Sequence, residues 1–93
     1  MKLHVKVEKY EIVEEGLFSS DYALYEVKTP AMNWIVQRRY SDFEWLYNSL
    51  KRFYPGRFVP PIAKKTTLKD TSGKHLYERM RTFEFFLNEL LFS

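Results

Sequence analysis

Two adjacent arginines, Arg38 and Arg39, stand where a strand-like run of the sequence gives way to a helix-like one. The stretch around them reads QRRYSDF, residues 37–43. A cation at the start of a helix faces the positive end of the helix macrodipole, which costs about 0.3–1 kcal/mol. An acidic residue would be the natural structural choice there. The pair therefore predicts that an anion from outside the chain binds at this position.

A third arginine, Arg79, interrupts the apolar side of a later helical pattern. With residues placed about 100° apart around the helix from Leu76, Arg79 falls at about 300°, inside the apolar arc. On the same projection Arg81 falls at about 140°, on the solvated side. Two interpretations of Arg79 remain open. Its side chain either reaches water or an internal acid from the edge of the core, or it is held there to meet an anion.

Neighbouring residues limit which side chains can share one site. Successive strand side chains point to opposite faces, so at most one of Arg38 and Arg39 readily joins a site on a given face. Tyr40 has two interpretations. It is either a hydrophobic staple that packs from the helix entrance against Trp45, or the apolar wall of a ligand pocket.

Motifs for catalysis and metal binding are missing from the sequence. The two histidines, His4 and His75, have no metal-ligand spacing, so we expect no metal site. The stretch SGKH, residues 72–75, lacks the upstream glycine and the Ser or Thr of a phosphate-binding loop. Ser41 and Asp42 do not follow the strand–turn pattern of a nucleophile elbow. We therefore predict that the protein is not an enzyme and carries no cofactor.

The composition fits one small domain spanning residues 1–93. Hydrophobic residues make up 45% of the chain, enough for a modest core, and the absence of cysteine excludes disulfides and thiolate metal sites. Apolar runs are too short to cross a membrane, and no signal peptide is visible, so we expect a cytoplasmic protein. The net charge of +3 is a weak indication of an acidic partner. Nucleic acid is a rival partner, but no nucleic-acid-binding motif is present and we expect none.

The hydrophobic pattern predicts an α+β fold, in which a three-stranded antiparallel sheet packs against a helical subdomain with a polyproline loop. Alternating runs predict strands at residues 2–12, 22–29 and 33–40. In the first of these the alternation changes phase, which predicts a bulge near Glu8 and Lys9.

Helical spacing predicts two helices in the second half of the chain. The first begins at Ser41, which we expect to be the N-cap of a capping box completed by Glu44. The second begins at about Lys74. The long connection between them contains Pro60 and Pro61, which favour an ordered polyproline segment.

Three stretches together resemble the phox-homology (PX) domain of sorting nexins. They are RRYSDFEWL at residues 38–46, VPPIAKK at 59–65 and LYERMRTFEFFL at 76–87, and the resemblance covers nearly the whole chain. It implies a three-stranded antiparallel sheet on a helical subdomain. It also implies a phosphoinositide-binding module for membrane targeting in protein sorting and trafficking. Many members bind phosphatidylinositol 3-phosphate, so the resemblance implies a peripheral protein of endosomal membranes.

The resemblance assigns roles to the residues around the first helix. Arg39 matches the arginine that grips the 3-phosphate of the lipid headgroup. Tyr40 matches the aromatic residue that forms the floor under the inositol ring. Ser41 would add a hydroxyl near the same phosphate.

Two further roles come from the later stretches. Lys65 matches a lysine directed toward the 1-phosphate. Lys64 is an auxiliary candidate, because Ala63 stands where the family commonly has a proline and leaves open which lysine reaches the phosphate. Arg79 matches the arginine that binds the 4- and 5-hydroxyls of the ring, which explains why it interrupts an apolar arc.

Two expectations concern membrane attachment and the rival function. The connection between the helices offers Val59, Ile62 and Leu68 as insertion residues, so hydrophobic anchoring should be shallow. A protein-interaction module with a degenerate lipid pocket is the alternative function.

The end of the chain gives one more prediction. Phe85 and Phe92 fall at about 180° and 160° on the helix projection, opposite the core stripe, and the helix stops without a cap. The family usually continues beyond this point. We therefore expect a domain shortened at its C-terminal helix, with both rings either covered by another copy of the chain or left partly exposed. Self-association and other domains of a parent protein are the expected partners besides the membrane. The alternative is that both rings pack under the sheet.

Overall fold

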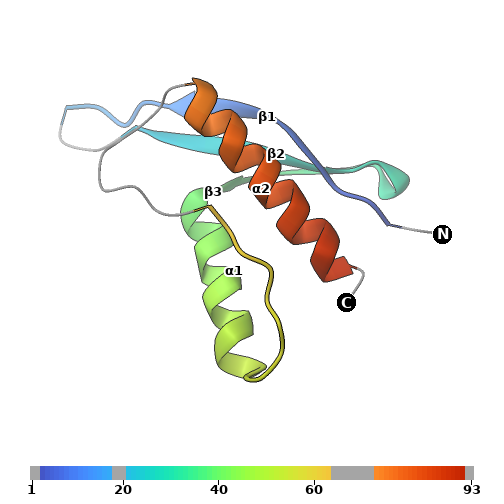
Figure 1. Ribbon diagram of the computed structural model, residues 1–93. Coiled ribbons are helices and arrows are strands. Elements are labelled where there is room, and N and C mark those ends of the chain that lie inside the picture. The colour runs from blue at the N-terminus through green and yellow to red at the C-terminus, as the bar shows by residue number, and fades with distance from the viewer. Residues whose placement is uncertain (1–2, 18–20, 64–72, 92–93) are drawn as a thin grey trace.

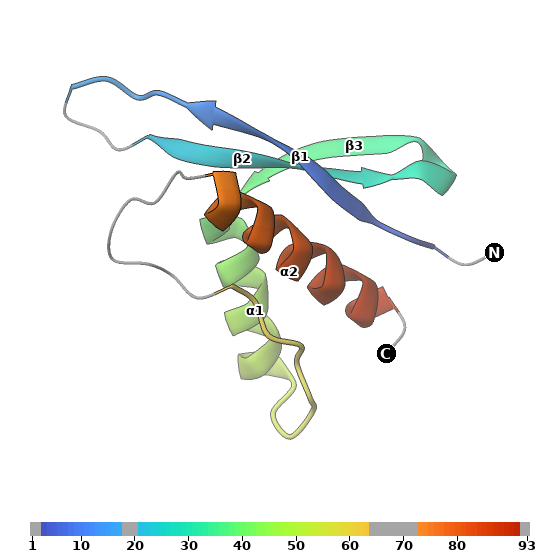
Figure 2. The ribbon, with the colours of Figure 1, turned by 45° about the horizontal axis from the view of Figure 1, so that its top comes forward.

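A computed structural model describes residues 3–17, 21–63 and 73–91 of the 93-residue chain. Strands β1 (Lys6–Val13), β2 (Tyr22–Thr29) and β3 (Trp34–Arg39) form an antiparallel sheet in the order β1-β2-β3. Helices α1 (Tyr40–Phe53) and α2 (Gly73–Leu91) lie on one side of this sheet (Figures 1 and 2). This arrangement confirms the predicted α+β fold.

A bulge in β1 keeps apolar residues on the helix side of the sheet. Lys6 pairs with Lys28 but Lys9 pairs with Glu26, so β1 carries one extra residue between the two pairs. The extra residue changes the phase of the alternation, as the sequence predicted. Val7 lies within this irregular stretch and is buried in the core, and Ile12, which follows the stretch, packs against the same core.

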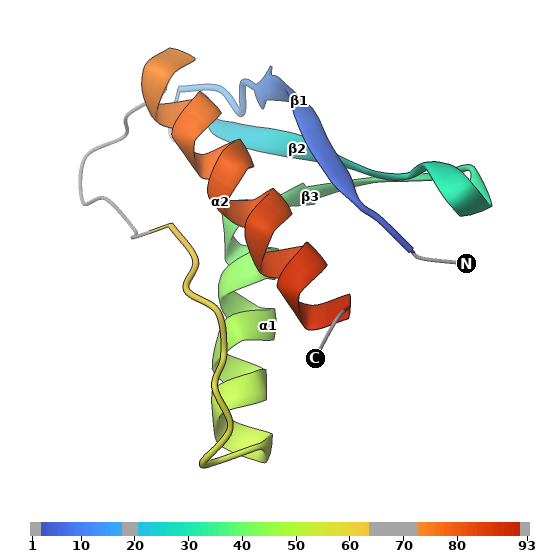
Figure 3. The same cartoon turned by 45° about the vertical axis from the view of Figure 1, so that its right-hand side comes forward.

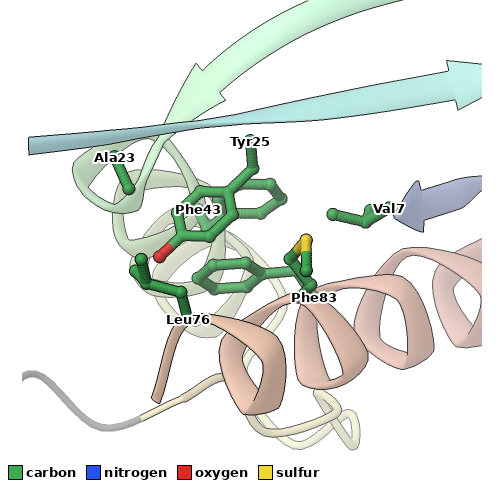
Figure 4. Close-up of a cluster of buried hydrophobic side chains, with 7 residues drawn as sticks. Val7, Ala23, Tyr25, Phe43, Leu76 and Phe83 are labelled. Carbon is green, nitrogen blue, oxygen red and sulfur yellow. The ribbon is translucent and has the colours of Figure 1, made fainter. Parts of the chain in front are cut away.

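The core lies between the sheet and the two helices (Figure 4). The rings of Phe43 from α1 and Phe83 from α2 stack with centroids 3.9 Å apart, and the Tyr25 ring of β2 meets both edge-on. The buried cluster consists of Val7, Ala23, Tyr25, Phe43, Leu76, Met80 and Phe83. Aromatic contacts therefore join α1, α2 and the central strand in one place.

Side chains of α2 also form hydrogen bonds with the backbone at the β1 edge of the sheet. The side-chain amide of Asn88 accepts a hydrogen bond from the Val5 N–H and donates one to the Val5 carbonyl, each 2.9 Å long. The Glu84 carboxylate accepts a third, 2.8 Å long, from the Val7 N–H. Backbone groups that an edge strand leaves unpaired are thereby satisfied.

The first helix begins one residue earlier than Ser41, so the predicted capping box is wrong. Arg39 is the N-cap residue, and its backbone N–H donates a 3.0 Å hydrogen bond to the carboxylate of Asp42. Asp42 accepts this hydrogen bond in place of Glu44 because Asp42 lies three residues after the N-cap Arg39. Its negative charge is also favourable in the first helical turn. Ser41 becomes the second residue of α1.

The predicted phase of the second helix agrees with the structure. Its buried residues are Leu76, Met80, Phe83 and Phe86. Arg81 is exposed, and so is Phe85, with 55% of its surface accessible. The alternative in which Phe85 packs under the sheet is therefore wrong, while Phe92 lies outside the described residues. No helix in the described part of the chain has the length and apolar character needed to cross a membrane.

Candidate functional site

The start of α1 carries the arginine that the sequence singled out. Arg39 is the last residue of β3 and the N-cap of α1, where backbone N–H groups lack helical partners. Among the described residues, no carboxylate lies within ion-pair distance of its guanidinium. The guanidinium carbon lies 3.9 Å from the centre of the Tyr22 ring instead. This stacking orients a full positive charge close to the positive end of the helix dipole.

Tyr22 was missed by the sequence analysis. The strand register places Arg39 opposite Leu24, so Arg39 shares a face of the sheet with Leu24 and with Tyr22 two residues away. Alternation in the second strand could have placed Tyr22 and Leu24 on one face. Which β3 residue stands opposite them depends on the pairing register, which the sequence does not specify.

Arg38 points to the other face, as predicted. It pairs with Tyr25, whose ring lies in the core on the helix side of the sheet. Its guanidinium donates a 2.8 Å hydrogen bond to the carbonyl of Gln37. The two neighbouring arginines therefore point to opposite faces of the sheet, and Arg38 lines a hollow on the helix side with Asp42 and Phe43.

Tyr40 connects α1 to the polyproline segment. Its hydroxyl donates a 2.6 Å hydrogen bond to the carbonyl of Ala63, and its ring packs 6.0 Å from that of Phe83. The staple interpretation is wrong because Trp45 points into solvent, with 69% of its surface exposed. The hydroxyl and the ring of Tyr40 are therefore both held by contacts within the fold.

Arg79 of α2 lies over the same tyrosine. Its guanidinium carbon is 4.5 Å from the centre of the Tyr40 ring, and the residue is half-buried at the edge of the core. Residues from α1, α2 and the polyproline segment thus meet at Tyr40. The sequence predicted that Tyr40 and Arg79 belong to one site, and the fold brings them into contact.

Burial controls the ionisation of the two tyrosines near Arg79. It raises the pKa of Tyr40, the negative charge of Glu44 raises it further, and the charge of Arg79 acts in the opposite direction. Burial also raises the pKa of Tyr25, again against the influence of Arg79. Both side chains are therefore neutral phenols at neutral pH, and neither cancels the positive charge of Arg79.

The remaining predicted site residues are placed as follows. Ser41 is exposed on the first turn of α1, next to Tyr40 in the chain. Lys64 and Lys65 follow Ala63 in the sequence but lie outside the described residues. Within the described ranges, no group of three or more histidine or acidic side chains could hold a metal ion.

Two of the three expected membrane-insertion residues are described by the structure. Val59 and Ile62 are half-buried, and Ile62 packs against the core cluster. Leu68 lies outside the described residues. The polyproline segment runs back along α1 to Tyr40 (Figure 3), so Val59 and Ile62 expose little apolar surface. Shallow anchoring stays a prediction.

Comparison with known proteins identifies the family. The family model described as "PX domain" matches residues 27–93. Sorting nexin mvp1 of Aspergillus fumigatus is 38% identical over 78 residues, which cover 84% of this chain and 11% of that protein. Human sorting nexin-16 is 35% identical over 83 residues, covering 88% of this chain and 24% of that protein.

Sorting nexin-41 of Candida albicans is a third relative, 32% identical over 93 residues, covering 88% of this chain and 14% of that protein. The chain therefore spans from about a tenth to a quarter of the length of these relatives. The matched range contains Arg39, Tyr40 and Arg79 and both helices. The sheet, the helices and the matched sequence agree, and the chain belongs to the PX domain family.

Proposed function

We propose that this domain binds phosphatidylinositol 3-phosphate and thereby attaches its parent protein to endosomal membranes. PX domains of sorting nexins are phosphoinositide-binding modules for membrane targeting, and this chain is one of them by sequence and fold. The single observation that carries the finer proposal is the meeting of Tyr40, Arg79 and Ala63 beside the N-terminus of α1.

The chemistry of these groups suits a phosphorylated inositol. The Arg39 guanidinium offers paired N–H donors that match two phosphate oxygens, and the adjacent helix N-terminus attracts the same anion. Tyr40 offers an apolar surface to the carbon face of the ring, while Arg79 donates to ring hydroxyls. Lys65, with Lys64 as the auxiliary candidate, would supply a cation for the 1-phosphate.

Attachment through this site alone should be weak. One headgroup contact and a modest net charge of +3 give limited membrane affinity. A parent protein would increase it through a second membrane signal or through several copies of the domain, since linked sites raise the effective concentration.

The test compares Arg39→Ala with Arg38→Ala in liposomes containing phosphatidylinositol 3-phosphate. Losing a charge-assisted phosphate contact costs about 1.5–3 kcal/mol, so Arg39→Ala should bind roughly ten- to a hundredfold more weakly. Arg38→Ala removes the same charge from the opposite face and should bind within about twofold of the wild type. Equal losses in both variants would contradict the assignment.

A liposome panel tests the headgroup preference. The wild type should prefer phosphatidylinositol 3-phosphate over the 4-phosphate, the 5-phosphate and the 4,5-bisphosphate at equal total charge. If no phosphoinositide binds above a phosphatidylserine background while the protein remains folded, the rival function as a protein-interaction module is favoured.

A further inference from the structure

The two edges of the sheet differ in what covers them. At the β1 edge, side chains of Glu84 and Asn88 from α2 bind the backbone of Val5 and Val7. At the β3 edge, all six residues of the strand are exposed. A strand edge left open in this way can pair with a further strand. The β3 edge is therefore the place where the sheet can be extended.

Two hydrogen bonds show which backbone groups of β3 point away from β2. The Arg39 N–H donates to the Asp42 carboxylate and not to β2, so the backbone of Arg39 is directed outward. Because this direction alternates along an antiparallel strand, Ile35 and Gln37 also direct their N–H and C=O groups outward. The Gln37 carbonyl agrees, since it accepts a hydrogen bond from the Arg38 guanidinium. The edge therefore presents the backbone of Ile35 and Gln37.

Contacts within the chain close both ends of this edge. At one end the Arg39 N–H is held by Asp42, and α1 begins at the next residue. At the other end the Asn33 N–H donates to the Pro30 carbonyl at 3.1 Å, and a φ of 54° takes Asn33 out of the extended conformation. The open part of the edge is therefore short, and its midpoint is Val36.

The side chains of the open part are largely apolar. Trp34, Ile35 and Val36 expose 59%, 55% and 41% of their surfaces. Charged side chains commonly protect an edge strand, but here the two cations of β3, Arg38 and Arg39, stand together at one end. A partner strand would pair with the free backbone groups and cover this apolar surface at the same time.

We propose that β3 pairs with β3 of a second copy of this chain, antiparallel and with Val36 opposite Val36 of the other copy. In this register Ile35 lies opposite Gln37 on both sides of the midpoint, so the free groups of each copy pair with the free groups of the other. Centring the pair on Gln37 would instead place Ile35 opposite Arg39, whose N–H is already bound to Asp42.

The side chains are complementary in the same register. Trp34 of each copy lies opposite Arg38 of the other, which allows the guanidinium to pack over the indole ring. Val36 forms an apolar pair with its counterpart. Between residues 34 and 38 no two like charges stand directly opposite each other. The edge is therefore self-complementary in backbone, charge and apolar surface, which favours a second copy as its partner.

The helices leave room for this contact. The connection between β2 and β3 projects beyond both helices in Figures 1, 2 and 3, and α1 of the second copy would begin beside that end of β3. The two-fold axis of such a strand pair is perpendicular to the sheet, so corresponding faces of the two copies point the same way. A dimer would thus present two headgroup sites to one membrane. This consequence rests on the proposed function, whereas the contact itself does not.

Sedimentation equilibrium without lipid tests the dimer directly. A contact of one short strand pair is small, so the wild type should dimerise reversibly in the micromolar to millimolar range. A folded chain that stays monomeric up to about 1 mM would overturn the inference. The open edge would then suit a strand of another protein.

Charge reversal at the midpoint tests the register. Val36→Lys and Val36→Glu each place two like charges opposite each other and should weaken dimerisation roughly tenfold or more. An equimolar mixture of the two variants should restore it, because opposite charges then meet. Phe85→Ser removes an exposed ring from α2 and should leave dimerisation unaltered. A mixture no stronger than either variant, or an equal loss in Phe85→Ser, would contradict the proposal.

A single introduced cysteine gives a test that does not depend on these charges. The chain has no cysteine of its own. Val36→Cys would place two thiols across a pair whose Cα atoms are about 4.5 Å apart, within disulfide range. Mild oxidation should link the copies of Val36→Cys but not those of Phe85→Cys. Absence of the link at concentrations where the wild type is dimeric would overturn the proposal.

The dimer and the headgroup site are tested separately. Val36→Lys should bind soluble inositol 1,3-bisphosphate as the wild type does, but should bind vesicles containing phosphatidylinositol 3-phosphate more weakly, because one attachment point is lost. Arg39→Ala should dimerise as the wild type does while losing the headgroup. If Arg39→Ala keeps headgroup binding while Val36→Cys is linked, the proposed function fails and the strand contact stands.

Discussion

The two sides of this small domain differ in how many of their side chains they bury. The side built from β1, β2 and α2 buries the rings of Tyr25, Phe83 and Phe86, and α2 contributes four buried side chains. On the side built from β3 and α1, all six residues of β3 are exposed, and α1, which is described throughout, buries Phe43 alone. Phe43 is also the residue that stacks on Phe83 and joins the two sides.

This difference separates stability from binding. The α2 side holds the fold together through packing and through hydrogen bonds to the edge of the sheet. The α1 side is attached at a few points, chiefly Phe43 and Tyr40, and leaves most of its surface to solvent. Substitutions on the two sides should therefore have different consequences, which the following predictions test.

The largest expected effect is on the free energy of unfolding. Phe83 is fully buried and contacts three other rings, so Phe83→Ala should destabilise the domain by about 3–5 kcal/mol, measured by denaturant titration. Trp45→Ala on the α1 side should change it by no more than about 0.5 kcal/mol. Comparable losses in the two variants would show that the two sides are not distinct.

Arg79 and Arg81 separate binding from stability within one helix. Arg79 lies over Tyr40, whereas Arg81 faces solvent. Arg79→Gln should weaken binding of soluble inositol 1,3-bisphosphate by about 1.5–3 kcal/mol in a calorimetric titration, because a charged donor is lost. Arg81→Gln should leave that affinity unaltered. Equal affinities of the two variants would mean that Arg79 takes no part in the site.

Substitution of Asn88 tests how much the hydrogen bonds between α2 and the edge of the sheet stabilise the domain. Asn88→Ala removes both hydrogen bonds to Val5, which are partly exposed, and should lower the free energy of unfolding by about 1–2 kcal/mol. Asn48→Ala on the exposed side of α1 is the control and should change stability by less than about 0.5 kcal/mol. Headgroup affinity should be the same in both variants at a temperature where both are folded.

The smallest effect is a dependence on alkaline pH. Burial raises the pKa of Tyr25 in the folded state, so the folded protein holds this proton more tightly than the unfolded chain. The resulting stabilisation is present below the unfolded pKa of about 10 and is lost as the pH rises through the folded value. Tyr25→Phe should therefore flatten the fall in stability above pH of about 10, as measured by thermal unfolding. An unchanged slope would show that Tyr25 does not contribute to it.

Local patterns were enough to predict the elements, the bulge in β1 and the position of Arg79. These depend on the periodicity of neighbouring residues, which the sequence contains directly. The N-cap was misplaced because Ser41 and Asp42 are both good capping residues, and the strand continues to Arg39. The contact between Arg39 and Tyr22, and the burial of Ile62, depend on pairing and packing between distant segments. No local pattern encodes those.

The hydrogen bond between Tyr40 and Ala63 has a consequence for how this domain can vary. It joins the two ends of the segment from Tyr40 to Ala63, which lie 23 positions apart in the sequence. The turn that follows α1 lies at the far end of that stretch (Figure 1), and this turn contains Gly56. Closing a flexible loop costs entropy that grows slowly with length, by about 0.6 kcal/mol for each doubling. Residues inserted at this turn should therefore be tolerated without disturbing the groups around Tyr40, so its length and chemistry can diverge while the anchored ends stay the same.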